Sequence, residues 1–131
     1  MSENYATTKT WRHGSCHCKK IKFKVFIKNN LKIYNCNCSI CFIKQNHNFL
    51  VDKRDFQFIS GQHYLSTYKF NTKQAVHNFC KICGVQIFNV ARLDEDCVGV
   101  RIYCMENYGP GVVESERLVV EFEDFDGRAW E

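Results

Sequence analysis

Nine cysteines in 131 residues are the feature that most restricts how this chain can fold. Seven of them fall into three tight groups, at positions 16–18, 36–41 and 80–83. The first 15 residues contain no apolar stretch of the kind a secretory signal has, so we expect a reducing, intracellular compartment that does not maintain disulfides. The odd number also argues against a disulfide scaffold. The grouping therefore favours metal ligation.

The spacing inside the groups suits metal binding by thiolates. Residues two apart on an extended segment project to the same side, so Cys16 and Cys18 can offer two sulfurs to one ion. Gly84 follows Cys83 and can adopt the positive φ that lets a C-x-x-C turn wrap around a metal. Zinc in tetrahedral coordination is the ion that such thiolates suit best.

Seven sulfurs divide naturally into a set of four and a set of three. Two pairs from distant parts of the chain would make a closed site that stabilises the fold; this quartet is Cys16, Cys18, Cys80 and Cys83. The other three lie within six residues and would hold a second zinc with one position free, as catalytic sites do; this trio is Cys36, Cys38 and Cys41.

Other arrangements of these residues remain open at this point. The trio could gain a fourth ligand and become inert; the candidates are His17, His47, His77, Cys97 and Cys104. An iron–sulfur cluster is possible, although no regular cluster motif is present. We interpret Cys97 and Cys104 as small buried hydrophobic residues, because Cys104 continues the apolar face of Val98 and Val100.

Period-two alternation of apolar and polar residues predicts an all-β fold. It is clearest where Ile21, Phe23, Val25 and Ile27 alternate mainly with lysines. The same pattern recurs at 85–90, 98–104 and 118–122, and shorter strands are expected at 48–51, 56–60 and 64–70. The best helical segment begins at Ser39 as its N-cap and continues to about Gln45.

Length and composition fit one domain over residues 1–131, with a core at about 11–130 and a loose N-terminus at 1–10. No apolar run approaches the ~18 residues that cross a bilayer, so we expect no membrane association. Residues 1–83 carry a net charge of +11 and residues 84–131 carry −7. We interpret the basic half mainly as solvated strand faces.

Three ordered motifs resemble the glutathione-dependent formaldehyde-activating enzyme family, which includes the animal centromere protein V. They are Gly14-Ser-Cys-His-Cys18, the C-x-C-S-x-C segment at 36–41, and Phe79-Cys-Lys-Ile-Cys-Gly84. The resemblance is clear from Trp11 to Val90. The segments 67–72 and 125–130 look closest to the centromere protein V branch.

Membership would imply a compact β-sheet fold like that of the Mss4 superfamily, with short helical turns and two zinc ions per chain. The motifs assign the quartet to a structural zinc and the trio to a catalytic zinc. The family's activity is that of a carbon–sulfur lyase, written as addition of the glutathione thiol to formaldehyde to give S-(hydroxymethyl)glutathione. The implied partner is therefore glutathione or a related small thiol.

The chemistry of the trio favours activation of a thiol over polarisation of a carbonyl. Three thiolates give the zinc site a formal charge of −1, which weakens it as a Lewis acid. Glutathione is anionic, and Lys44, Arg54 or Lys73 could attract it, although the sequence does not place them.

Two other functions remain as alternatives. One is a non-catalytic zinc module of the centromere protein V type that docks nucleic acid, chromatin or a cytoskeletal partner, in the nucleus or the cytoplasm. Two zinc ions and seven thiolates would bring the net charge of +4 to about +1, so such binding should be weak and salt-sensitive. The other is redox or electrophile sensing through release of zinc from the trio.

Overall fold

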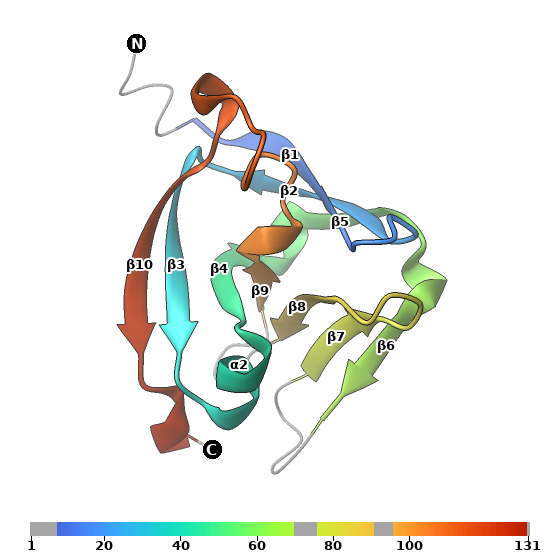
Figure 1. The fold of residues 1–131 in the computed structure, drawn as a ribbon, viewed down its shortest axis with the longest axis vertical. Helices are drawn as coiled ribbons and strands as arrows, with labels where there is room; N and C mark the ends of the chain where they lie inside the picture. Colours follow the sequence, from blue (N-terminus) through green and yellow to red (C-terminus); the bar gives the residue numbers. More distant parts are fainter. Residues whose placement is uncertain (1–7, 70–75, 91–95, 131) are drawn as a thin grey trace.

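The structure is a computed structural model that describes residues 8–69, 76–90 and 96–130. Two sheets form the fold (Figure 1). The smaller has the order β1-β2-β5, and the larger has the order β10-β3-β4-β9-β8-β7-β6. All neighbouring strands are antiparallel except β10 and β3, which are parallel. The all-β class is confirmed.

The strands of the smaller sheet are β1 (Thr10–Ser15), β2 (Lys22–Ile27) and β5 (Phe56–Ser60). Those of the larger sheet are β3 (Asn30–Cys36), β4 (His47–Asp52), β6 (Leu65–Tyr68), β7 (Val76–Cys80), β8 (Gln86–Val90), β9 (Cys97–Arg101) and β10 (Val119–Phe125). One α-helix, α2 (Ser39–Lys44), is found within the described residues. Short 3-10 turns occupy Lys53–Asp55, Gln62–Tyr64, Ile102–Cys104, Glu114–Glu116 and Gly127–Trp130.

The core lies between the two sheets, where aromatic side chains from both meet. Phe56 of β5 stacks on Phe23 of β2 at 5.1 Å between ring centroids and contacts Phe88 of β8 at 4.9 Å. The predicted buried face is confirmed: Phe23, Val25 and Ile27 of β2 are buried, and so is Ile21 directly before the strand. Phe26, which interrupts the polar face, packs against Trp11 of β1 at 5.2 Å.

Other sequence predictions need correction. The strand expected at 98–104 ends at Arg101, and a 3-10 turn follows, although Ile102 and Cys104 remain buried. In β10 the predicted inner face is not buried throughout, because Leu118 is buried whereas Phe122 is 48% exposed. This strand lies at a sheet edge, and its burial decreases as it extends past the core.

Three boundaries also differ. Ser39 is the first residue of α2, not its N-cap, which is the extended Cys38. The loose end predicted for residues 1–10 is wrong at Thr10, which begins β1; residues 1–7 lie outside the described part. The strand predicted at 64–70 spans Leu65–Tyr68, and Phe70 lies outside the described residues.

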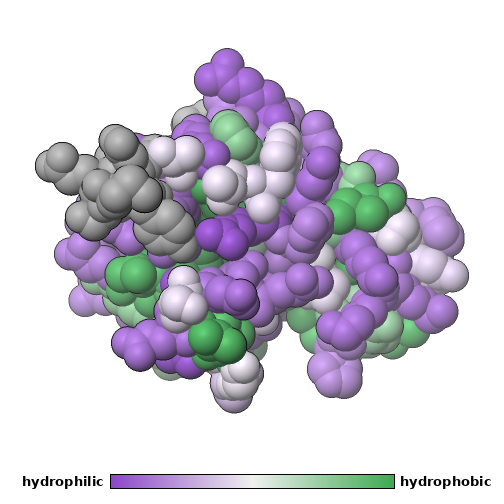
Figure 2. Space-filling model, turned by 90° about the horizontal axis from the view of Figure 1, so that it is seen from above, coloured by the Kyte–Doolittle hydropathy of each residue, from purple (hydrophilic) through white to green (hydrophobic). Residues whose placement is uncertain are grey.

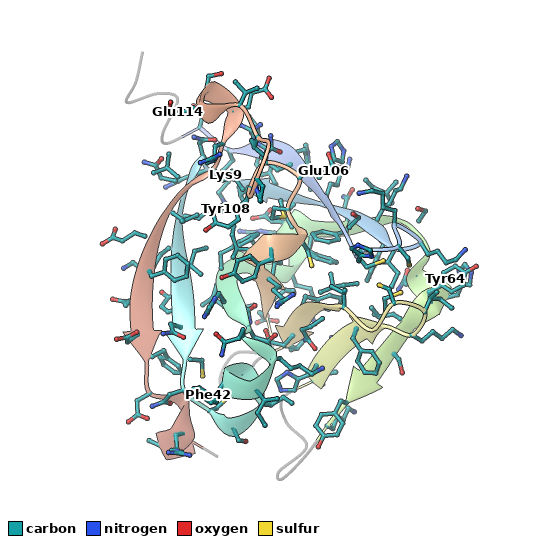
Figure 3. All side chains as sticks on the ribbon, viewed as in Figure 1. Lys9, Phe42, Tyr64, Glu106, Tyr108 and Glu114 are labelled. Atoms are coloured by element: carbon teal, nitrogen blue, oxygen red, sulfur yellow. The ribbon has the colours of Figure 1, made fainter. Side chains whose placement is uncertain are left out.

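The helices and the surface hydrophobic residues can be considered together. Across the described residues, no helix has the length and hydrophobicity to cross a bilayer. Hydrophobic residues on the face seen in Figure 2 form separate patches within a largely hydrophilic surface. Two of the exposed hydrophobic residues are Phe42 and Ile43 of α2, and Figure 3 shows Phe42 on this helix near the end of β3.

Candidate functional site

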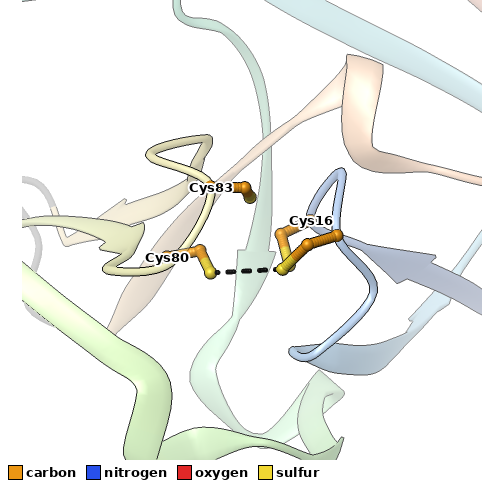
Figure 4. A group of neighbouring side chains, drawn as sticks. Cys16, Cys80 and Cys83 are labelled. Atoms are coloured by element: carbon orange, nitrogen blue, oxygen red, sulfur yellow. Dashed lines mark hydrogen bonds between the residues drawn. The ribbon is translucent and has the colours of Figure 1, made fainter.

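The structure brings the four cysteines of the quartet together at two facing turns. Cys16 and Cys18 lie in the loop between β1 and β2, and Cys80 and Cys83 lie at the turn between β7 and β8. Figure 4 shows Cys80 and Cys83 pointing toward Cys16. All four sulfurs lie within 4.8 Å of one another. The two sheets therefore meet at this cluster.

Backbone geometry explains how each turn directs its sulfurs. Gly84 has φ +78°, and its N–H donates to the carbonyl of Cys80 at 2.7 Å, so the predicted positive-φ glycine is confirmed. On the opposite turn Lys19 adopts φ +63°. Cys18 thus lies in a turn, not on the extended segment predicted from its spacing to Cys16, because the chain reverses there before β2.

Distances within the quartet fit a tetrahedral metal. Four sulfurs about 2.3 Å from a zinc ion stand about 3.8 Å apart along the edges of the tetrahedron. The Sγ atoms of Cys16 and Cys18 are 3.5 Å apart, and those of Cys18 and Cys80 are 3.7 Å apart. Backbone N–H groups of Ile21 and Ile82 point at the sulfurs of Cys16 and Cys80, each at 3.4 Å. The donor set and its spacing are compatible with zinc.

The trio lies at the start of α2. Cys36 ends β3, Cys38 is the N-cap of the helix, and Cys41 is in its first turn. Their sulfurs lie within 4.8 Å of one another, and Cys38 and Cys41 are buried. No other His, Cys, Asp or Glu of residues 8–69, 76–90 and 96–130 joins either set.

Small neighbours leave room for these sulfurs. Gly127 lies against the trio so closely that a Cβ there would meet the Sγ of Cys36. Asn46 is buried beside Cys41, with its Nδ2 4.0 Å from the Sγ, while its Oδ1 has no hydrogen-bond partner among the described residues. The trio is thus enclosed by the C-terminal segment on one side and by the loop after α2 on the other.

Hydrogen bonding divides the charge unequally within the trio. Hydrogen bonds from Cys38 and Cys41 lower the pKa of Cys36 to about 3, despite its partial burial. The bonds from Cys36 and Cys38, together with burial, raise the pKa of Cys41 well above its ordinary value. Without a metal the trio therefore carries a thiolate at Cys36, and binding a metal at neutral pH must release the proton of Cys41.

The quartet shows a similar division. Burial raises the pKa of Cys83, but backbone N–H groups and the thiols of Cys80 and Cys18 outweigh it and lower the pKa to about 6. A backbone hydrogen bond from Lys20 lowers the pKa of Cys18, but desolvation and the neighbouring thiols raise it to about 11. The arrangement thus holds a thiolate at Cys83 and a thiol at Cys18 at neutral pH.

Two residues near the trio have surroundings that the sequence did not predict: His77, weighed only as a possible fourth ligand, and Arg101. His77 is 2% exposed, and burial lowers its pKa while the charge of Cys38 opposes this effect. Arg101 donates through Nη2 to the carbonyl of Lys44 at 3.2 Å, at the end of α2. The polar neighbours of His77 in the sequence gave no sign of its burial, and Arg101 gave no signal beyond its place at the end of a strand.

The other histidines and cysteines weighed as fourth ligands have different surroundings. His47 Nδ1 lies 2.7 Å from the hydroxyl of Tyr103. Cys104 is buried, as predicted, and its thiol donates to the carbonyl of Gln86 at 3.4 Å, while Cys97 is only partly buried. Of the three cations considered for glutathione, Arg54 is highly exposed and pairs with Asp52, and Lys73 lies outside the described residues. Only Lys44 is placed beside the trio.

Fold and site together define the class of this protein: it is all-β and carries one cluster of four cysteines and one of three. The model of the glutathione-dependent formaldehyde-activating enzyme family matches residues 11–119, and the chain belongs to this family. Its fold is similar to that in the crystal structure of a Rhodobacter sphaeroides protein, with a TM-score of 0.68 and 24% sequence identity. That match covers 85% of this chain and 99% of the other. Membership indicates a function connected with glutathione and formaldehyde.

Proposed function

We propose that the protein is a zinc-dependent carbon–sulfur lyase that forms S-(hydroxymethyl)glutathione from glutathione and formaldehyde. In this reaction the thiol sulfur forms a bond to the formaldehyde carbon, the carbonyl π bond breaks, and the thiol proton ends on the new hydroxyl oxygen. The observation that carries the proposal is the trio, which offers three sulfurs and has no fourth His, Cys, Asp or Glu among the described residues. Family membership supports the substrates.

The two clusters would have different tasks. The quartet would hold a structural zinc, because its four sulfurs come from two distant turns and complete a tetrahedral shell by themselves. Cys36, Cys38 and Cys41 would hold the second ion. When bound there, zinc supplies the positive charge that lowers the pKa of an incoming thiol.

Residues of the chain prepare the trio for this task. The buried positions of Cys38 and Cys41 exclude water from one side of the site. Gly127 allows the C-terminal segment to cover Cys36 without a side chain in the way. We further infer a cytoplasmic location, because nine free cysteines suit a reducing compartment. Docking to chromatin or the cytoskeleton, as in the centromere protein V branch, stays a prediction from sequence.

Exchange NMR tests the activity directly. Zinc-loaded protein is added to glutathione and ¹³C-formaldehyde, and the exchange rate between formaldehyde and the adduct is compared with that in buffer. We expect acceleration by the wild type and by Cys97→Ser, a cysteine outside both clusters, but not by Cys38→Ser. Exchange that is equal in wild type and Cys38→Ser would reject the lyase function. Metal analysis of the same samples should give two zinc ions per chain in the wild type.

A further inference from the structure

Two cations lie side by side at the end of α2. Lys44 is the last residue of the helix, three positions after Cys41, and Arg101 is the last residue of β9. The Nη2 of Arg101 donates to the backbone carbonyl of Lys44 at 3.2 Å. Both side chains are partly buried, so their charges are only partly solvated. We call these two residues the cationic pair.

The cationic pair has no acidic partner in the described part of the chain. Every ion pair found among residues 8–69, 76–90 and 96–130 involves other residues. Lys44 Nζ instead donates to Gln86 Oε1 at 2.9 Å and lies 5.0 Å from the centroid of the Phe79 ring. The Arg101 guanidinium lies 5.1 Å from the ring centroid of Tyr103. Arg101 also hydrogen-bonds the thiol of Cys104, whose pKa burial raises to about 11, so the described groups in contact with the two charges are neutral.

This arrangement is unfavourable without an anion. Burial and the charge of Arg101 both lower the pKa of Lys44, which shows that the ammonium is poorly compensated. The hydrogen bond to the Lys44 carbonyl at the end of α2 accounts for one N–H group of Arg101. That bond does not require the Lys44 ammonium as a second cation beside Arg101. An ammonium has three donors and a guanidinium five, so donors remain on both groups. A bound carboxylate would accept from them and offset the charge.

The cationic pair also lies close to the trio. His77 is buried, and charges from both groups act on it: Cys38 of the trio raises its pKa and Lys44 of the cationic pair lowers it. Lys44 and Cys41 share a helix of six residues, and three positions along a helix place side chains on neighbouring parts of its surface. A small molecule whose sulfur reaches the trio would therefore have Lys44 nearby on the same helix, with Arg101 hydrogen-bonded to the Lys44 carbonyl.

We propose that Lys44 and Arg101 form a carboxylate-binding subsite that makes the trio selective for small thiols that carry a carboxylate. This inference rests on the proposed function and deepens it, because it explains how an anionic thiol is preferred over a neutral one. A different role, in which the two cations only offset the negative charge of the thiolates, makes a different prediction. It would affect a thiol with free carboxylates and its ester equally.

Pairing variants with modified substrates separates these roles. Glutathione and its diethyl ester, in which both carboxylates are blocked, are compared in the exchange NMR assay with zinc-loaded wild type, Lys44→Gln and Arg101→Gln. We expect the wild type to prefer the acid roughly tenfold or more, through KM, as the loss of a charge-assisted hydrogen bond implies. Both variants should lose this preference and leave ester turnover nearly unchanged. Arg101→Lys should retain part of it.

Lys22→Gln removes an exposed charge from β2 and is the matched control, which should keep the full preference. The subsite is overturned if Lys44→Gln and Arg101→Gln reduce turnover of acid and ester alike, or if neither differs from the control.

A binding arm keeps the subsite testable if turnover fails. S-methylglutathione has both carboxylates but no thiol, and its affinity is measured by calorimetry on the same proteins. If the wild type shows no turnover, the lyase function fails, and binding decides the subsite. Affinity that falls roughly tenfold in Lys44→Gln but not in Lys22→Gln supports it. Absent binding, or equal affinity in all variants, overturns it.

Discussion

Replacing one cysteine in each cluster should show that the two metal sites contribute unequally to stability. A metal stabilises a fold only to the extent that it binds the folded chain better than the unfolded chain. In the unfolded chain the first and last cysteines of the trio are still only five positions apart, so the trio can bind an ion without the rest of the fold. The quartet must first bring together Cys18 and Cys80, which are 62 positions apart.

The difference in loop closure sets the expected magnitude. Closing a loop costs about (3/2)RT ln n, so a 62-residue loop costs about 2 kcal/mol more than a five-residue loop. The unfolded chain therefore binds metal at the quartet more weakly by this amount, relative to the trio. At equal intrinsic affinity, Cys80→Ser should lower the free energy of unfolding by about 2 kcal/mol more than Cys38→Ser. Both residues are buried, so other losses should be similar.

Urea unfolding at a fixed free zinc concentration, followed by circular dichroism, measures this difference. Cys104→Ser is the matched control, because Cys104 is also buried but belongs to neither cluster. It should cost about 1 kcal/mol, equally with or without metal, because a hydroxyl can keep the hydrogen bond that the thiol donates to the Gln86 carbonyl. With a chelator present, the difference between Cys80→Ser and Cys38→Ser should disappear. Equal losses in zinc, or a loss at Cys80 no larger than at Cys104, would refute the division into structural and open sites.

Two further predictions concern the trio. Gly127→Ala should reduce zinc from two ions per chain to one with little change in circular dichroism, because its Cβ would meet the sulfur of Cys36; retention of both ions would contradict this contact. In metal-free protein, iodoacetamide should label Cys36 at every pH above about 3, because hydrogen bonds from Cys38 and Cys41 lower the pKa of Cys36 to that value. Labelling of Cys83 should instead rise through about pH 6, so peptide mapping that finds Cys83 modified before Cys36 at pH 5 would show that the assignment is wrong.

The sequence predicted strands well where one face of the strand is buried along its whole length. Ile21, Phe23, Val25 and Ile27 alternate with polar residues, and all four are buried. The pattern failed in β10, where Phe122 continues the apolar period but is 48% exposed. Alternation shows which residues share a face, but only the position of the strand in the sheet decides whether that face is covered. An edge strand that extends past the core cannot be recognised from its own residues.

The two cysteine clusters could be anticipated for a similar reason. Sulfurs two or three positions apart meet through local backbone geometry, so Gly84 and the C-x-x-C spacing were sufficient to expect a turn there. Arg101 could not be anticipated as a neighbour of the trio, and His77 was anticipated only as one of five candidate fourth ligands. They come from β9 and β7, and only the strand order β9-β8-β7 of the larger sheet brings them near α2. Long-range pairing of this kind leaves no local trace in the sequence.

Charge in this protein illustrates why local surroundings matter more than totals. The basic first half was interpreted mainly as solvated strand faces, and two of its lysines have such ordinary surroundings: Lys24 lies 4.6 Å from the ring centroid of Trp11, and Lys32 pairs with Glu123 at 3.8 Å. Lys44 differs because it is partly buried beside Arg101. Partial burial lowers the effective dielectric constant, so an anion would interact more strongly with this charge than with one in water. An anionic ligand gains the most binding free energy from cations that are least hydrated. For an anionic molecule the end of α2 is therefore a better binding site than the more basic surface of β2.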